Sequence, residues 1–306
     1  IMIHYLAAHG PHVLAERHKD KFKDTVFPEP PTLLDDYAGR APGEVAGELI
    51  WSRLIQNDYP QYQHVKKGYT GNVTNDTRLM YQEYLRGYLR LALSLDDNVG
   101  HVLDYLDTSG LATNTVVIFT SDNGYFLGEH GFYNKMWMYE EGYRLPLMVR
   151  LPKTLGGIAP GSLNDEIVGM FDMAPTILDL AGVKVPADIQ GMSIRPLLMG
   201  GKTDWRKEFY YHYYGVGPMK NNWIGEHGLF GISTKTEKLV CYPDLKGRTF
   251  WEYFDLAVDP LEMRNLYGDP ACKEKAAAME IRLRAAAEQY KDTKTVRMMD
   301  EGQRAE

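Results

Sequence analysis

The chain has 306 residues, of which 44% are hydrophobic and 12% aromatic. It is long enough for one large α/β domain plus a smaller one, and apolar enough for a folded core. The formal net charge of −7 argues against a broad nucleic-acid-binding surface. No apolar run reaches the roughly 18 residues of a membrane-spanning helix. The two cysteines, Cys241 and Cys272, do not make a disulfide framework and are compatible with one bridge or two free thiols.

The N-terminal third is predicted to be mostly irregular and to precede one long helix. Residues Ile1–Ala7 are expected to form a strand that leads to a loop around His9. The prolines that follow predict a long loop over the functional face of the domain. From Thr77 to Asp107, apolar residues recur at three- and four-residue spacing, which predicts a helix. Asn75 or Asp76 is the expected cap of this helix.

The most informative segment begins at Thr115 and ends at Gly124. Five β-favouring residues lead into Ser-Asp122-Asn123-Gly124, which predicts a buried parallel strand that ends in a tight polar turn. Ligands of open α/β sheets lie outside the carboxyl ends of the strands. A carboxylate beside an amide suits Ca²⁺ or Mg²⁺. The alternative is an ordinary turn, because Asn and Gly tolerate positive φ angles.

A loop rich in His, Lys and Arg follows this turn. Lys135 is the candidate contact for an anionic ester, and its alternative is a solvated surface lysine. His130 lies close to two glycines and is either a contact to the ester or a loop histidine held by its surroundings. Arg144 is expected to pair with Glu140 or Glu141 rather than to contact a substrate. The predicted metal ligands and this loop together suggest a site for an anionic ester.

The C-terminal half is predicted to contain two kinds of structure. A strand over Leu147–Leu151 and a helix over 172–181, ended by Gly182, continue the α/β pattern. Past Gly200, short aromatic strands indicate an antiparallel sheet, on which a helix over Ala271–Lys291 is expected to pack. The predicted strands are Glu208–Tyr214, Phe230–Thr234, Lys238–Tyr242 and Trp251–Leu256. The predicted divisions are residues 1–200, residues 201–291, and a polar, disordered tail over 292–306.

Four segments carry a resemblance to a known family. They are Thr115–Pro152, Phe171–Gly182, Gln190–Leu198 and Phe254–Leu266. On these segments the chain resembles the sulfatase family of the alkaline-phosphatase-like superfamily, and is most similar to bacterial sulfatases that act on sulfated sugars. The resemblance implies an α/β fold in which helices flank a mixed or parallel sheet. It also implies a smaller C-terminal subdomain with an antiparallel sheet and a helix.

The resemblance also implies roles for individual residues. Asp122 and Asn123 match calcium ligands of the family, so Ca²⁺ is expected rather than Mg²⁺ or Mn²⁺. Lys135 matches the lysine that contacts the sulfate ester, and His9 matches a sulfate-contacting histidine, although Leu6-Ala7-Ala8 stands where the family has Lys-Ala-Pro. These two residues are the expected catalytic pair. His130, with the later residues His212 and His227, is a further candidate for substrate binding.

The nucleophile of the family has no match in this sequence. Sulfatases use a formylglycine made from the cysteine of Cys-x-Pro-x-Arg, or from a serine in its place. Cys241-Tyr-Pro243 has Leu245 where the arginine should stand. The chain is therefore expected to be the C-terminal part of a sulfatase, inactive by itself, from a periplasmic or secreted parent.

Two alternatives to this hypothesis exist. One is a phosphonate or phosphodiester hydrolase of the same superfamily. The other is a non-catalytic, truncated homologue. The expected partner is a sulfated sugar or another sulfate ester, with no nucleic acid and no membrane span, and the sequence does not indicate an oligomeric state.

Overall fold

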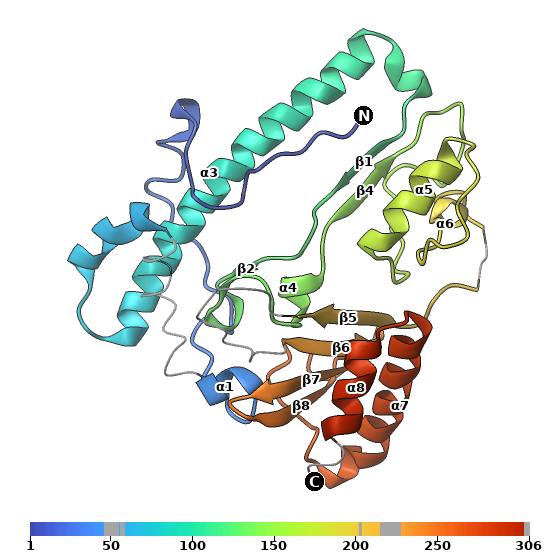
Figure 1. Cartoon of the computed structure of the whole chain (residues 1–306). Coiled ribbons are helices and arrows are strands. Elements are labelled where there is room, and N and C mark those ends of the chain that lie inside the picture. Colours follow the sequence, from blue (N-terminus) through green and yellow to red (C-terminus); the bar gives the residue numbers. More distant parts are fainter. Residues whose placement is uncertain (46–54, 56–58, 202–203, 215–227, 303–306) are drawn as a thin grey trace. The chain divides into compact units, whose positions relative to one another are not determined.

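The computed structural model describes residues 1–45, 55, 59–201, 204–214 and 228–302. The chain forms two compact units (Figure 1). The first unit contains Ile1–Asp36, Ala46–Lys135 and Glu140–Thr154. The second unit contains Tyr37–Val45, Met136–Tyr139 and Leu155–Glu306.

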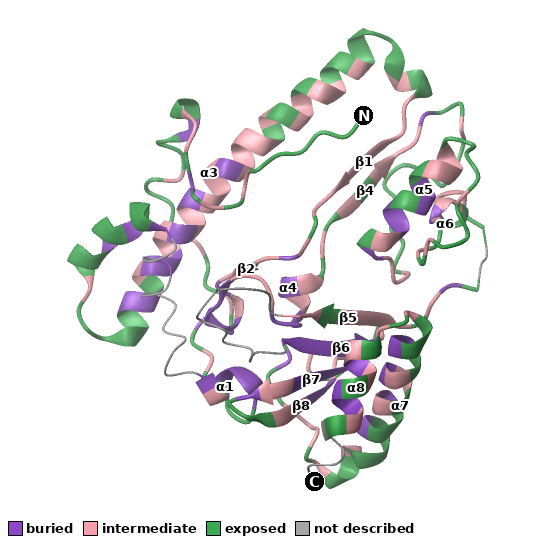
Figure 2. Cartoon of the chain, viewed as in Figure 1, coloured by how far each residue is buried: buried purple, intermediate pink, exposed green. Residues whose placement is uncertain are grey.

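The long helix α3 (Val73–Thr108) dominates the first unit. It confirms the predicted helix but begins four residues earlier, because Asn72 and not Asn75 or Asp76 caps it by accepting a hydrogen bond from the Asn75 amide. Its buried residues lie between Asp76 and Leu91, and Figure 2 shows the remaining turns as half-buried or exposed. The shorter helices of this unit are η1 (Glu16–His18), η2 (Pro60–Gly68), η3 (Leu111–Asn114), η4 (Glu129–Gly131) and α4 (Glu140–Tyr143).

Two short antiparallel ladders follow α3. Strand β1 (Val117–Thr120) pairs with β4 (Leu147–Arg150), and β2 (Phe126–Leu127) pairs with β3 (Tyr133–Asn134). Strands β1 and β4 form where the sequence predicted strands. The prediction that the first of them is a buried parallel strand is wrong for this ladder. Its register is antiparallel, Val117 opposite Arg150, and β1 is only half-buried. β-branched residues favour a strand, but they do not determine whether its partner strand is parallel or antiparallel. That direction depends on the path of the chain between the two strands.

The predicted strand at Ile1–Ala7 does not form among the described residues. This segment has no strand assignment, and Ile1, Met2 and Leu6 are exposed. A strand exists only with a partner that accepts and donates its backbone hydrogen bonds, and apolar composition alone does not supply one. The segment leads into the His9 loop, where the His9 amide donates to the Leu6 carbonyl oxygen.

The second unit begins with the short helix α1 (Ala41–Val45). Three further short helices lie around Asp172, and they are η5 (Met170–Asp172), α5 (Met173–Leu180) and α6 (Arg195–Leu198). Asp172 is fully buried and accepts hydrogen bonds from the Gly169 and Met192 amides and from the Arg206 guanidinium. Gly182 ends α5 with a φ of 71°, as predicted, because a left-handed residue there favours glycine.

The C-terminal part of the second unit is a four-stranded antiparallel sheet in the order β5-β6-β7-β8. Its strands are β5 (Phe209–Tyr213), β6 (Leu229–Ser233), β7 (Glu237–Leu245) and β8 (Arg248–Asp255). All four lie where the aromatic pattern predicted strands. After η6 (Pro270–Cys272), the predicted helix forms as α7 (Lys273–Gln289).

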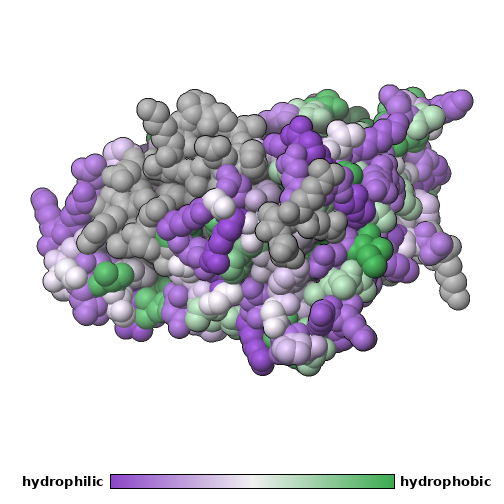
Figure 3. All heavy atoms as spheres, turned by 60° about the horizontal axis from the view of Figure 1, so that its bottom comes forward, coloured by the Kyte–Doolittle hydropathy of each residue, from purple (hydrophilic) through white to green (hydrophobic). Residues whose placement is uncertain are grey.

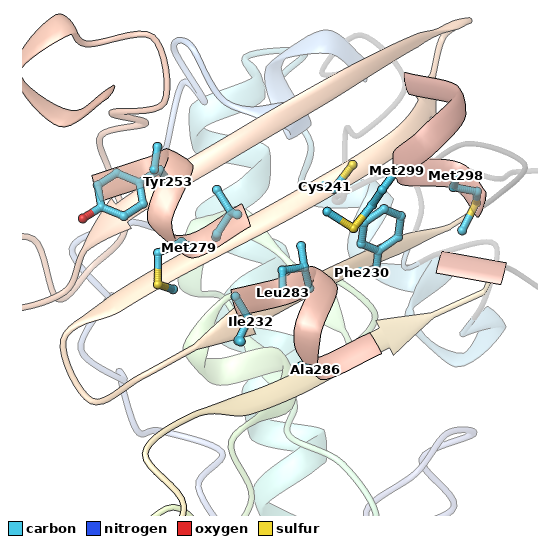
Figure 4. Packing of buried hydrophobic residues seen from close by; sticks show 11 residues of the cluster. Phe230, Ile232, Cys241, Tyr253, Met279, Leu283, Ala286, Met298 and Met299 are labelled. Atoms are coloured by element: carbon cyan, nitrogen blue, oxygen red, sulfur yellow. The ribbon is translucent and has the colours of Figure 1, made fainter. Parts of the chain in front are cut away.

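Helix α7 packs on this sheet through one apolar core. Phe230, Ile232 and Cys241 from the strands meet Met279 and Leu283 of α7 (Figure 4). Cys241 and Cys272 are both free thiols.

The prediction of a disordered tail from residue 292 is wrong for the described residues. Residues Thr293–Gly302 form helix α8, and its Met298 and Met299 belong to the same core as Met279 and Leu283 of α7 (Figure 4). The composition is polar, but Thr295, Met298 and Met299 recur at helical spacing and give the helix one buried face.

Hydrophilic side chains cover most of the described part of one face of the molecule (Figure 3). In the face that Figure 3 shows, hydrophobic side chains form small separate groups among hydrophilic ones. None of the helices within the described ranges is both long and apolar enough to cross a membrane.

Candidate active site

The predicted metal ligands lie at the carboxyl end of β1. Asp122 is exposed, and its carboxylate accepts a hydrogen bond from the Ser121 hydroxyl at 3.5 Å. The Asn123 amide nitrogen donates to the Gly124 carbonyl oxygen at 2.7 Å, which leaves the Asn123 side-chain oxygen as an acceptor. The turn offers one carboxylate and one amide oxygen at adjacent positions.

Close packing, and not backbone conformation, explains the glycine of this turn. Neither Asn123 nor Gly124 has a left-handed φ. A Cβ atom on Gly124 would lie 2.3 Å from the Glu141 carbonyl oxygen and 2.6 Å from that of Arg144. The turn therefore lies directly against the backbone of α4. The alternative of an ordinary positive-φ turn does not describe it.

These oxygen donors fit Ca²⁺ in kind but make only part of its shell. Calcium takes about six to eight oxygen ligands. Within the described ranges, no cluster of three or more His, Cys, Asp or Glu side chains is arranged to hold a metal ion. Asp122 and Asn123 would therefore hold the ion together with ligands from outside this pair.

Lys135 follows β3 and is half-buried. Its neighbours Asn134 and Met136 have φ angles of 75° and 103°, so the backbone turns sharply on both sides of the lysine. The Lys135 side chain makes no hydrogen bond or ion pair with the described residues. An ammonium group that has no partner in this part of the chain is available to an anion.

His9 lies in an exposed loop, where its Nδ1 is 2.8 Å from the Gly10 carbonyl oxygen. His9, Lys135 and the Asp122–Asn123 pair all belong to the first unit. Among the described residues, no hydrogen bond or ion pair joins these three loops to one another. The three loops therefore belong to one unit but are not directly bonded to one another in the described structure.

His130 is buried and has structural partners. Its side chain is 1% exposed, and its Nδ1 is 2.9 Å from a carboxylate oxygen of Asp35. The His130 amide donates to the Thr32 hydroxyl at 2.8 Å. Of the two interpretations that the sequence allowed, this placement supports the histidine held by its surroundings and leaves no exposed surface for a substrate.

His212 lies on β5 of the second unit. Its ring stacks on Tyr210 and meets Tyr214 edge-on, and its Nδ1 is 3.3 Å from Asp292 of the chain between α7 and α8. Burial lowers the pKa of His212, and the Asp292 carboxylate opposes that shift. About half of the side chain stays exposed. His227 lies outside the described residues.

Two further sequence expectations concern Arg144 and Cys241. Arg144 lies 3.9 Å from Glu140 in a surface ion pair, which agrees with the expected structural role. Cys241 is 1% exposed inside β7, and burial raises the pKa of its thiol well above the ordinary value. A buried, protonated thiol of this kind is not a reactive one.

Sequence reasoning missed a buried group of aromatic residues in the first unit. His12 lies among Tyr59, Tyr62 and Tyr84, with ring centroids 5.0 to 5.7 Å away. Tyr81, Tyr84 and Tyr88 recur at helical spacing in the sequence and were the available signal. Spacing alone does not show that a histidine from another loop packs among them.

Comparison with known proteins gives the family. Residues 1–183 match the family described as Sulfatase, and residues 128–289 match the one described as N-sulphoglucosamine sulphohydrolase, C-terminal. A Bacteroides thetaiotaomicron protein named N-acetylglucosamine-6-O-sulfatase is 36% identical over 95% of this chain and 58% of its own length.

Solved structures agree with that match. One, described as a complex with its substrate D-glucosamine-2-N,6-O-disulfate, has a TM-score of 0.77 at 34% identity and covers 94% of this chain and 64% of that one. A phosphonate monoester hydrolase from Silicibacter pomeroyi shares the fold, with a TM-score of 0.74 at 22% identity over 92% of this chain and 54% of that one. The chain thus spans less than two thirds of these relatives. It has the alkaline-phosphatase-like α/β fold and belongs to the sulfatase family.

Proposed function

We propose that this chain supplies the calcium-binding and sulfate-binding part of a sulfatase that acts on a sulfated carbohydrate. A 6-O-sulfated amino sugar is the favoured substrate class. The observation that carries the proposal is the exposed Asp122–Asn123 turn after β1, followed by a half-buried Lys135 without a partner among the described residues. The similarity to a protein named N-acetylglucosamine-6-O-sulfatase supports the sugar class.

Each residue has a distinct role in this proposal. Asp122 and Asn123 contribute oxygen ligands to a calcium ion, which stabilises negative charge on the sulfuryl oxygens when it is bound. The Lys135 ammonium binds one of those oxygens and adds to the stabilisation. His9 donates a proton to the leaving alcohol oxygen, a role that its exposed imidazole permits.

His130 has a positioning role in this proposal. Its bonds to Asp35 and Thr32 fix the loop that leads through β3 to Lys135. His212 remains a candidate sugar contact because its ring is half-exposed and its orientation is set by Tyr210 and Tyr214.

In this proposal the chain binds the sulfate ester but lacks the nucleophile that hydrolyses it. The sequence contains no Cys-x-Pro-x-Arg motif, and the nearest approach to it, at Cys241, lies inside β7. The chain by itself is expected to bind the ester without hydrolysing it. An aryl sulfate is therefore hydrolysed no faster by the chain than by its Lys135→Ala variant.

Calorimetry with glucosamine 6-sulfate tests the binding half of the proposal. Titration in saturating Ca²⁺ should give binding that glucosamine does not give. Lys135→Ala should weaken it by at least about tenfold, since a hydrogen bond to a charged group contributes about 1.5–3 kcal/mol. The matched control is Lys153→Ala, an exposed lysine of the same unit, which should bind as the wild type does.

Metal dependence gives a second test. Asp122→Ala should weaken Ca²⁺ binding measured without the sugar, because it removes the only carboxylate of the pair. Equal affinity for the sugar with and without its sulfate, or no effect of Lys135→Ala, would contradict the proposal. Preference for a phosphonate monoester over the sulfate would favour the alternative hydrolase. Failure to bind either ester would favour a non-catalytic homologue.

A further inference from the structure

We propose that a buried tyrosine cluster positions the two loops that carry His9 and the Asp122–Asn123 pair. The inference rests on the proposed function, because that proposal gives these loops their roles. The cluster consists of His12, Tyr59, Tyr62, Tyr84, Tyr88 and Tyr125, all in the first unit.

His12 connects the cluster to the His9 loop. It follows His9-Gly10-Pro11, is 6% exposed, and has its Nδ1 2.5 Å from the Tyr62 hydroxyl. Its other ring nitrogen is buried and has no hydrogen-bond partner among the described residues, so Tyr62 alone fixes the ring by a hydrogen bond. Burial, with a contribution from His9, lowers the pKa of His12 to about 4. His12 is therefore neutral near pH 7.

Tyr125 connects the cluster to the predicted metal ligands. It follows Gly124 directly, and its hydroxyl lies 3.0 Å from that of Tyr59 and 2.5 Å from that of Tyr84. Its ring also stacks on Tyr88 at 5.5 Å between centroids. Tyr84 and Tyr88 both belong to α3, so the metal-ligand turn is bonded to a long helix rather than only to its own short strand.

Two glycines allow the backbone to touch the cluster. A Cβ on Gly10 would lie 2.0 Å from the Tyr59 ring, and one on Gly87 would lie 1.9 Å from the Tyr62 hydroxyl oxygen. The His9 loop and helix α3 therefore contact the cluster without an intervening side chain. Tyr59 reaches both loops, because its ring packs on Gly10 and its hydroxyl bonds Tyr125.

Hydrogen exchange of the whole chain tests the positioning role without any ligand. Tyr62→Phe removes the bond to His12, and Tyr84→Phe removes a bond to Tyr125, while both keep the ring. Loss of one hydrogen bond should speed exchange by about fivefold, in residues 8–13 for the first variant and in residues 121–126 for the second. Tyr105→Phe replaces an exposed tyrosine on α3, the helix that carries Tyr84, and should not change the exchange of either segment.

Calcium affinity provides the second readout. Tyr84→Phe should weaken Ca²⁺ binding several-fold. Tyr62→Phe should leave Ca²⁺ binding unchanged and weaken only the binding of the sulfated sugar. Unchanged exchange in both segments, or a uniform increase throughout the first unit, would overturn the positioning role. An equal loss of calcium affinity in both variants would overturn it in favour of general destabilisation. A wild type that binds no calcium would instead contradict the proposed function, and the exchange result would still decide the role of the cluster.

Discussion

Replacing the buried Glu252 of β8 with glutamine should change how the stability of the second unit depends on pH. Glu252 is 1% exposed, and its carboxylate accepts hydrogen bonds from the Ala41 amide at 2.6 Å and from the Tyr242 hydroxyl at 2.9 Å. Burial raises the pKa of this carboxyl to about 7, although these two hydrogen bonds and the Arg40 charge act against the shift. The raised pKa makes the carboxyl a proton-binding site of the folded chain.

The size of this change in the free energy of unfolding follows from the difference between the pKa values of Glu252 in the folded and unfolded states. The ordinary pKa is 4.5 and the folded value is about 7, and each pKa unit corresponds to about 1.4 kcal/mol. Between these values the folded state holds the proton and the unfolded state has released it. The free energy of unfolding should therefore fall as the pH rises from about 4.5 to about 7, by about 3 kcal/mol in total, and this contribution should be constant above pH 7.

Urea unfolding of wild type and Glu252→Gln at a series of pH values measures this contribution. Trp137, Trp205 and Trp251, which lie in the second unit, contribute to the fluorescence signal. A glutamine can accept from Ala41 and donate to the Tyr242 oxygen, so it resembles the protonated acid at every pH. The difference in unfolding free energy between the two proteins should grow by about 3 kcal/mol across the window.

The matched control is Glu274→Gln, an exposed glutamate on α7. Its stability should stay parallel to that of the wild type at all pH values. A difference between wild type and Glu252→Gln that is constant over the whole range would refute the reasoning, because it would mean that burial does not hold the proton on this carboxyl.

Three further predictions concern stability. Leu283→Ala should lower the unfolding free energy by about 3 kcal/mol in urea because it opens a cavity in the core, whereas Ile281→Ala, exposed on the same helix, should cost under about 0.5 kcal/mol. Asp172→Asn should cost about 3 kcal/mol in the same assay, because the nearly buried Arg206 loses its counter-charge; an effect under about 1 kcal/mol would contradict this. Asn72→Ala should cost about 1 kcal/mol in thermal unfolding followed by circular dichroism, since it removes the cap of α3, and no change would show that the cap is not needed.

Local patterns in the sequence predicted the two longest helices, α3 and α7, and the strands of the C-terminal sheet. The spacing of apolar residues located α3, the helix expected over 172–181 and ended by Gly182 forms as α5, and the aromatic runs after Gly200 located all four strands of the C-terminal sheet. These patterns work because a helix or strand that buries one face must repeat its apolar residues with its own period. The motif at Asp122 and Asn123 also predicted a turn after a strand, and in the structure β1 ends at Thr120 and the chain bends at these two residues.

Pairing and burial were decided by the tertiary structure. The direction of the β1–β4 ladder and the absence of a strand at Ile1–Ala7 depend on which backbone partner is present, which composition does not encode. Helix α8 forms in a polar segment because two methionines reach the core beneath α7.

The tertiary structure also determined the surroundings of the candidate site. In sequence, His130 was equally compatible with a substrate contact and with a structural role, and only its burial against Asp35 distinguishes the two. His12 gave no signal, because its tyrosine partners come from segments distant in sequence. The sequence by itself determined which side chains can bind a cation or a sulfate, since that depends on their chemistry. Which of them are exposed, and which hold the others in place, depends on packing between distant segments, and only the folded chain decides it.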